Sequence, residues 1–181
     1  QWGDLWSATP QEGFFHTPPG GASELVNRYG GGVLVCGGSH LLDLVNYMFG
    51  RPQRIYAQMH IPQGRDYDLL AAALLQTPAC PVHFEAAAHP LKHIGFLRDG
   101  WDERLEVSGT KGRLEFLSAA WDQFEHKASL LLHYDDSTGA STEYRFAPCS
   151  PFARALAFFC GNIARGEQGS QSAATGYDVD E

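Results

Sequence analysis

The chain has 181 residues, of which 44% are hydrophobic and 12% aromatic, a composition typical of a globular domain that buries a sizeable core. Thirteen Lys and Arg residues against 21 Asp and Glu residues give a formal net charge of -8, and no basic cluster supplies the positive stripe that nucleic acid or an anionic membrane would require. No apolar run approaches the ~18 residues of a membrane-spanning helix and the N-terminus has no signal-peptide pattern, so we expect a cytoplasmic protein.

The four cysteines and eight histidines follow no metal-site or disulfide pattern. Cys36, Cys80, Cys149 and Cys160 are widely spaced and form no C-x-x-C motif, so we expect reduced thiols rather than a zinc knuckle or a disulfide scaffold. None of the histidines lies in H-E-x-x-H or another ligand spacing. We therefore expect no metal site.

The N-terminal residues 1–22 are rich in proline, glycine and aromatic side chains. Because proline and glycine favour extended and turn conformations, we predict a loop-rich arm with one short strand at Asp4–Ala8. Ser23 is a good helix N-cap, which predicts a short helix over Ser23–Tyr29 leading into the glycine run that follows.

A glycine-bounded apolar stretch organises the rest of the chain. Three glycines open it and one closes it, and the apolar residues between them recur with amphipathic spacing, which predicts a helix over Gly32–Phe49. Within this helix Cys36, His40, Asp43 and Tyr47 occur at i, i+4, i+7 and i+11. On an α-helix this spacing places a thiol, an imidazole, a carboxylate and a phenol on one face.

Gly37 and Gly38 lie inside the predicted helix, where each costs about 1 kcal/mol relative to alanine. We therefore expect another group to come close to the backbone at this point. His40 has two interpretations at this stage: a general acid/base, or a hydrogen-bonded structural histidine on a half-buried helix.

The sequence after the predicted helix changes to strand periodicity. The apolar run before the Thr77–Pro81 turn fits a helix by propensity alone, but it pairs naturally with the alternating segment after the turn, so we predict a hairpin. Residues 89–101 are predicted to form a connection that contributes side chains to a site. The predicted strands, about seven in number, are Pro52–Ile61, Asp68–Gln76, Val82–Ala88, Glu103–Ser108, Gly112–Leu117, Ala128–Tyr134 and Thr142–Phe146.

Consecutive hairpins predict a largely antiparallel open sheet with helices packed on one face, an α+β fold. A second helix is predicted from the Ser150 N-cap, with Pro151 at its first position, to the stop at Gly166. The acidic residues 178–181 are typical of a helix N-terminus and predict the start of another helix, with its body outside the chain.

Three segments resemble the C-terminal domain of the Gfo/Idh/MocA oxidoreductases, a family that includes inositol dehydrogenases and glucose-fructose oxidoreductase. Residues 30–43 are similar to the family pattern G-G-G-x-L-x-D-x-G-x-H-x-x-D, and an apolar helix and G-x-P follow in both. Residues 105–112 resemble the L-x-V-x-G-T-x-G hairpin of the family, and residues 152–166 resemble its late helix. The resemblance covers roughly residues 24–181.

The resemblance implies the substrate-binding and oligomerising half of an NAD(P)-dependent oxidoreductase acting on CH–OH groups of a sugar, a polyol or a related small hydroxy compound. His40 would be the catalytic general acid/base, with Cys36, Asp43 and Gly37 binding substrate. Asp43 as a solvated or capping carboxylate and Cys36 as a small buried apolar residue remain the alternatives. Family members also commonly associate through the sheet face, which implies a homodimer or homotetramer.

Two departures from the family pattern bear on this function. Cys36 stands where the pattern has an aspartate, and a thiol holds no fixed negative charge at neutral pH unless its pKa is depressed. The sequence also has no G-x-G-x-x-G after a strand and no E-K-P triplet. We therefore expect residues 1–181 to be a single C-terminal domain, a fragment or natural truncation without the N-terminal Rossmann domain, that cannot bind NAD or NADP in the family manner alone.

A second class of function fits the same departures. The family includes sugar-sensing regulators that keep the fold without the chemistry, so a non-catalytic sugar-sensing or protein-interaction module is the alternative. A hydrolase on this scaffold has no support, because the sequence shows no paired-carboxylate spacing.

Overall fold

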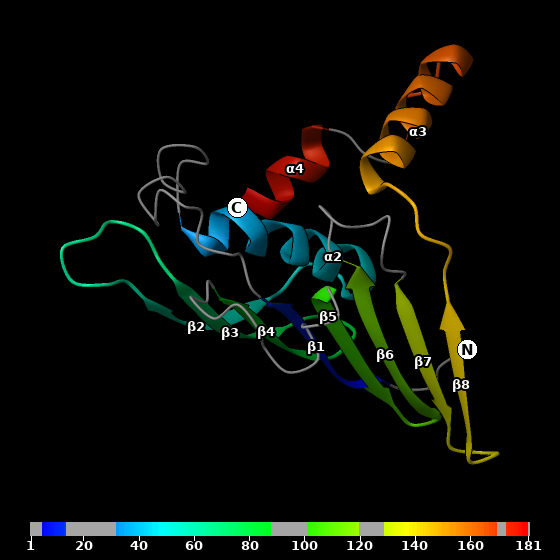
Figure 1. The fold of residues 1–181 in the computed structure, drawn as a ribbon. Coiled ribbons are helices and arrows are strands. Elements are labelled where there is room, and N and C mark those ends of the chain that lie inside the picture. The colour runs from blue at the N-terminus through cyan, green and yellow to red at the C-terminus, as the bar shows by residue number, and fades with distance from the viewer. Residues whose placement is uncertain (1–4, 14–31, 88–100, 120–128, 170–172, 181) are drawn as a thin grey trace.

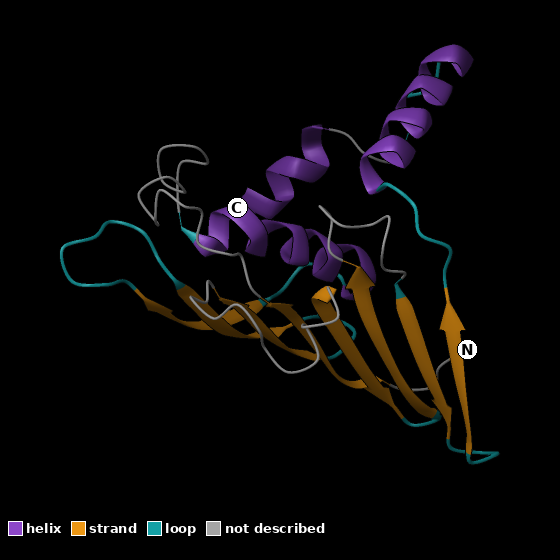
Figure 2. Ribbon diagram, viewed as in Figure 1, coloured by secondary structure: helices purple, strands orange, loops and turns teal. Residues whose placement is uncertain are grey.

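The computed structural model describes residues 5–13, 32–87, 101–119, 129–169 and 173–180. In these ranges the chain is α+β: eight strands form one sheet, and the helices lie on one side of it (Figures 1 and 2). The predicted fold class is therefore confirmed. The predicted helix at Ser23–Tyr29 and residues 89–100 of the predicted connection lie outside the described residues.

The strands follow the order β2-β3-β4-β1-β5-β6-β7-β8 across the sheet. Neighbouring strands are antiparallel except for β1 and β4, which are parallel. The bounds are β1 Leu5–Gly13, β2 Arg54–His60, β3 Leu70–Gln76, β4 Pro81–Ala87, β5 Trp101–Gly109, β6 Gly112–Ala119, β7 Leu130–Asp135 and β8 Ala140–Arg145.

Strand β1 is longer than the predicted strand at Asp4–Ala8 and lies in the middle of the sheet. In the register, Ala8 lies opposite Val82 of β4 on one side and Val107 of β5 on the other. Pro10 also belongs to this strand, although proline has no N–H to give to a ladder and is usually confined to edge strands. This proline explains why the sequence pattern predicted a shorter strand within a loop-rich arm.

The other predicted strands are confirmed with small changes at their ends. The apolar run at the third strand is a strand and not a helix, since β3 pairs with β2 on one side and β4 on the other. Ala71 and Leu75 of β3 are buried, whereas Leu74 is exposed. Because both faces of β3 carry apolar side chains, the sequence alone shows no alternation there.

The predicted helix at Gly32–Phe49 is present, but its first part is not α-helical. Residues Leu34–Gly38 form a π-helix, η1, and Ser39–Phe49 form the α-helix α2. Gly38 is buried, and a Cβ atom on it would lie 3.2 Å from Phe84 Cζ and 3.3 Å from Ala86 Cβ. The expected close approach to the backbone is thus confirmed, and the approaching group is strand β4.

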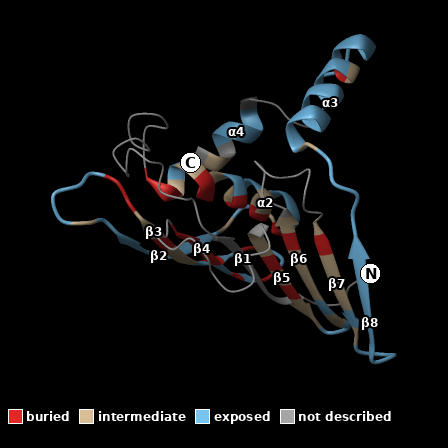
Figure 3. Cartoon of the chain, in the orientation of Figure 1, coloured by how far each residue is buried: buried red, intermediate tan, exposed pale blue. Residues whose placement is uncertain are grey.

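The hydrophobic core lies between α2 and the face of the sheet beneath it, here called the inner face (Figure 3). Leu41 and Val45 of α2 are 2% and 0% exposed, and they belong to one cluster with residues from three strands. The strand residues of this cluster are Ala71 and Leu75 of β3, Val82, Phe84 and Ala86 of β4, and Leu105 and Val107 of β5. The opposite side of the sheet is called the outer face.

Helix α3 spans Pro151–Arg165 and confirms the second predicted helix. The Ser150 hydroxyl accepts a hydrogen bond from the Ala153 N–H at 3.2 Å, and Gly166 ends the helix in the left-handed conformation with φ of 67°. The helix projects away from the sheet (Figure 1). Its apolar side chains at positions 152, 156, 159 and 163 are more than half exposed.

Helix α4 spans Ala173–Asp180 and lies beside α2. The prediction of a helix that begins at the acidic cluster of residues 178–181 was wrong, because α4 begins upstream and residues 178–180 fall at its end. Ala173 and Ala174, which have the highest helix propensity, begin the helix upstream of the acidic cluster. Within the described residues, no helix is long and apolar enough to cross a membrane.

Candidate functional site

The helix that carries His40 is fixed at its start by Asp68. The Leu34 N–H donates to Asp68 Oδ2 at 2.9 Å, and the Val33 N–H donates to the Asp68 backbone oxygen at 3.1 Å. Asp68 is only 4% exposed, and a Cβ atom on Gly32 would collide with it. The first N–H groups of a helix have no partners within the helix, so Asp68 satisfies them and favours this end electrostatically.

The predicted site residues differ in exposure along η1 and α2. His40 and Asp43 are exposed, Cys36 is half-buried, and Gly37 is buried. His40, Asp43 and Tyr47 lie on the regular α-helix and share an exposed face, but Cys36 lies in the π-helix. Because a π-helix closes i→i+5 hydrogen bonds, α-helical spacing does not describe how Cys36 lies relative to His40.

Glu103 of β5 is a residue that the sequence analysis did not single out. Burial raises the pKa of the Glu103 carboxyl, and the charge of His40 and a hydrogen bond from the Ser118 hydroxyl act in the opposite direction. Glu103 and Ser118 lie opposite each other in the β5–β6 register. The structure therefore brings an imidazole from α2 and a carboxylate and a hydroxyl from two strands into one neighbourhood.

The sequence did contain a signal for Glu103. In the predicted hairpin Leu105 and Val107 point toward the core, and Glu103 has the same strand parity. A carboxylate at a core-facing position is costly unless something compensates it, so such a position is a candidate for a site. The prediction began the alternation at Leu105 and overlooked this carboxylate.

The start of η1 is a helix N-terminus preceded by glycines. Such a helix start commonly binds the phosphate of a dinucleotide through its free N–H groups. Its Val33 and Leu34 N–H groups already donate to Asp68, so they cannot cradle a phosphate. The described strands form hairpins and one parallel pair, without the strand–helix–strand repeat of a dinucleotide-binding fold. Within the described residues, this helix start is therefore occupied by Asp68 and is not open to a dinucleotide phosphate.

Metal binding receives no support from the described part of the chain, where no three His, Cys, Asp or Glu side chains are grouped to hold an ion. None of the four cysteines forms a disulfide.

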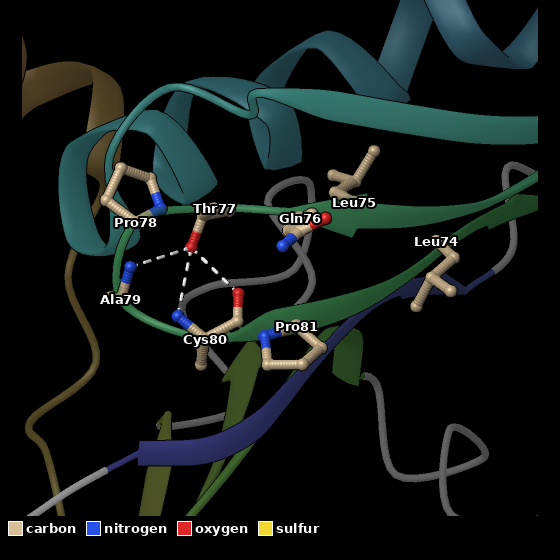
Figure 4. A pocket seen from close by; sticks show the side chains of 8 residues that line it. All are labelled: Leu74, Leu75, Gln76, Thr77, Pro78, Ala79, Cys80 and Pro81. Carbon is tan, nitrogen blue, oxygen red and sulfur yellow. Dashed lines mark hydrogen bonds between the residues drawn. The ribbon is translucent and has the colours of Figure 1, made fainter.

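A hollow of about 300 Å³ lies at the β3–β4 turn, at the other end of α2 from η1 (Figure 4). Thr77 organises this turn: its hydroxyl donates to the Cys80 backbone oxygen at 2.9 Å and accepts from the Cys80 N–H at 3.2 Å. Pro78 lies close to Gly50, the residue that ends α2. The lining residues, 74–81, carry no ionisable group except the Cys80 thiol, whose pKa is raised by burial, so we do not place the site here.

Comparison with known families decides the classification. Residues 3–115 match the family profile described as the GFO/IDH/MocA C-terminal domain, and this stretch contains both His40 and Glu103. The chain belongs to the GFO/IDH/MocA family. The resemblance seen in the three sequence segments is thus confirmed. No curated protein matches the sequence.

Solved structures show the same GFO/IDH/MocA fold at low sequence identity. A protein from Desulfitobacterium hafniense described as an NADPH-dependent oxidoreductase aligns with a TM-score of 0.75 at 14% identity, over 98% of this chain and 52% of its own. KijD10, a 3-ketoreductase from Actinomadura kijaniata in complex with NADP and TDP-benzene, aligns with a TM-score of 0.71 at 16% identity, over 98% of this chain and 50% of its own. Levoglucosan dehydrogenase in complex with NADH and levoglucosan aligns with a TM-score of 0.70 at 16% identity, over 98% of this chain and 54% of its own. The chain spans about half the length of these structures.

Proposed function

We propose that the chain is the substrate-binding and oligomerising half of an NAD(P)-dependent oxidoreductase that acts on a sugar, a polyol or a related small hydroxy compound. The observation that carries the proposal is His40, an exposed imidazole on helix α2 of a GFO/IDH/MocA domain, whose charge acts on the half-buried carboxylate of Glu103. The proteins of similar fold include a 3-ketoreductase and levoglucosan dehydrogenase, which supports a carbonyl or hydroxyl substrate.

In this proposal His40 moves a proton to or from the reacting hydroxyl or carbonyl oxygen as the general acid/base. Histidine suits this role because its unperturbed titration lies close to neutral pH. Asp43 lies one turn further along α2 and is exposed, so it would bind a substrate hydroxyl, while buried Gly37 and half-buried Cys36 would shape the floor beneath. NAD or NADP would supply the hydride acceptor or donor, held by a dinucleotide-binding domain.

The test is turnover of the protein encoded by the complete gene, assayed for nicotinamide reduction with NAD and NADP against a panel of sugars and polyols. We expect His40→Ala to lower turnover by about 10²-fold or more if His40 is the general acid/base. His83→Ala is the matched control, because His83 is also an exposed histidine but lies on β4. Turnover unchanged by His40→Ala would remove His40 from the mechanism.

The alternative is a sugar-sensing or protein-interaction module without hydride transfer. The half-buried thiol at position 36 and the occupation of the η1 start by Asp68 favour it. Nicotinamide reduction distinguishes the two functions. A sensor should bind sugar, seen as shifts of the His40 resonances, but should not reduce NAD or NADP.

We also propose a homodimer or homotetramer formed through the outer face of the sheet. Tyr56, Leu74 and Tyr134 share the strand parity of this face and are 70%, 46% and 44% exposed. Analytical ultracentrifugation should show an oligomer that Leu74→Asp weakens. An unchanged mass for Leu74→Asp would contradict this interface.

The cysteines without disulfides favour a cytoplasmic location.

A further inference from the structure

The described sheet has two edges, β2 and β8, and their sequences differ in charge. An edge strand leaves backbone N–H and C=O groups open to a strand of another chain, and proteins commonly protect such an edge with charged side chains. On β8, Glu143 and Arg145 supply these charges and form an ion pair. On β2, Arg54 is the only Asp, Glu, Lys or Arg residue. β2 is therefore the less protected of the two edges.

β2 also exposes apolar side chains on both faces of the sheet. Ile55 and Met59 are 64% and 48% exposed on the inner face, and Tyr56 is 70% exposed on the outer face. Ile55 and Met59 lie opposite Leu75 and Ala71 of β3, which belong to the core. No β2 residue belongs to the core cluster of the described residues. The apolar layer of the inner face thus continues to this edge, where it is open to solvent.

The sequence around β2 is symmetric in the features that limit strand pairing. Pro52 and Pro62 lie on either side of β2, at equal distances from its central residue, Ala57. Proline has no N–H to give to a ladder, so the two prolines confine regular pairing to the residues between them. A two-fold axis through Ala57 would place β2 antiparallel to β2 of a second copy, with every residue of Arg54–His60 paired.

This register would bring compatible side chains together. Ile55 would lie opposite Met59 of the second copy, so that exposed apolar side chains of the two inner faces cover each other. Arg54 would lie opposite His60, which puts the two Arg54 guanidinium groups at opposite ends of the paired strands. Self-pairing of β2 would therefore use the open backbone groups, cover apolar side chains and keep like charges apart.

We propose that β2 pairs antiparallel with β2 of a second copy of this chain, centred on Ala57, so that the sheets of the two chains become continuous. The occupant of the edge is a second copy because β2 is complementary to itself in its prolines, its apolar residues and its charge. The contact uses the backbone edge of β2 and does not depend on the outer-face interface proposed above. An edge contact and a face contact in one molecule would assemble four chains.

Cysteine cross-linking in the 181-residue chain tests the pairing. The exposed thiols Cys149 and Cys160 are first replaced by serine, and Ala57→Cys is then introduced at the exposed centre of β2. Directly opposite Cα atoms of an antiparallel pair are about 4.5–5.5 Å apart, a separation that a disulfide spans. We expect diamide to convert this variant to a disulfide-linked dimer on a non-reducing gel. Thr142→Cys, at an exposed position on the β8 edge, is the matched control and should run as a monomer.

The register makes a second cross-linking prediction. Ile55→Cys alone and Met59→Cys alone should not cross-link, whereas an equal mixture of the two variants should, because the two positions lie opposite each other between copies. All these positions are exposed, and circular dichroism will verify that the fold is intact. Failure of both Ala57→Cys and the mixture to cross-link would overturn the proposal, as would equal cross-linking of Thr142→Cys. Cross-linking of Ile55→Cys alone would overturn the register.

Analytical ultracentrifugation separates the edge contact from the outer-face interface. In a Leu74→Asp background, which weakens the outer-face contact, Ala57→Lys should destabilise the remaining dimer, because two ammonium groups would lie directly opposite each other. We expect the dimer dissociation constant to rise by about tenfold or more, whereas Thr142→Lys on β8 should leave it unchanged. A monomeric Leu74→Asp chain, or an unchanged dissociation constant in Ala57→Lys, would overturn the edge pairing and leave the outer-face interface standing. A dimer that Ala57→Lys weakens and Leu74→Asp does not would support the edge pairing and reject the outer-face interface.

Discussion

Asp68 offers the sharpest test of how this fold presents its candidate site. Its side chain accepts from the Leu34 N–H and is almost completely buried, in a loop before β3 that is far from η1 in the sequence. Asp68→Ala removes the acceptor and leaves a partly buried N–H without its partner. We therefore expect a loss of stability that is larger than for a surface substitution.

The size of this effect follows from two comparable estimates. Losing a helix N-cap acceptor costs about 0.5–2 kcal/mol, and leaving a buried donor unsatisfied costs about 1–3 kcal/mol. We expect about 2 kcal/mol for Asp68→Ala, because removing a buried carboxylate also relieves its desolvation. For a chain of 181 residues this corresponds to a Tm decrease of about 4–8 °C.

Urea unfolding followed by circular dichroism is the assay, with Asp68→Asn as the matched control. Asparagine keeps an oxygen acceptor but loses the charge near the helix N-terminus, so it should cost only about 0.3–1 kcal/mol. The m-value should stay constant in both variants if only the native state changes. Wild-type stability in Asp68→Ala, or equal losses in the two variants, would refute the argument that the hydrogen bond fixes this helix.

Three further predictions concern the core, the reactivity of the thiols and the change of stability with pH. Leu41→Ala should lower the free energy of unfolding, measured in urea, by about 2–5 kcal/mol. Leu156→Ala, at an exposed position on α3, should change the free energy of unfolding by no more than about 0.5 kcal/mol. Equal losses in the two variants would contradict the assigned core. Burial raises the pKa of Cys80, so iodoacetamide should modify the exposed thiols on and just before α3 first, and mass spectrometry showing early Cys80 labelling would be inconsistent with its burial. The Ser137 hydroxyl and N–H lower the pKa of Asp135, which contributes stability present above its unfolded-state pKa and lost as pH falls through its folded-state pKa. Ser137→Ala should therefore be less stable than wild type near neutral pH and converge with it in acid; a pH-independent difference would exclude this linkage.

Much of the fold could be predicted from local sequence signals. The Ser150 cap and the Gly166 stop define α3, and the alternation around Leu105 and Val107 defines the β5–β6 hairpin. Strand β1 could not be predicted in full, because its pairing with β4 and β5 depends on residues about 70–100 positions away in the register. The π-helix likewise has no local signature beyond its glycines, and packing of Gly38 against β4 accompanies it.

The sequence predicted the residues of the candidate site that lie on the helix, but not Glu103 on strand β5. The helix pattern and the family resemblance indicated His40, which lies exposed on α2 as the amphipathic pattern allows. Glu103 is distant in sequence from α2, and its place on the inner face depends on the pairing of β5 in the sheet. Such pairs depend on tertiary geometry, and strand parity is the signal that brings them within reach of sequence reasoning.

The central place of β1 has a consequence for how the chain folds. Strands β2 to β4 and strands β5 to β8 are two sets of neighbours along the chain, and β1 alone joins the two sets in the described sheet. Each set can form by local pairing, but β1 must close long loops to reach β4 and β5, so we expect its insertion to be the slow step of refolding. Until β1 is in place, β4 and β5 present open edges to other chains, and aggregation during refolding should begin there.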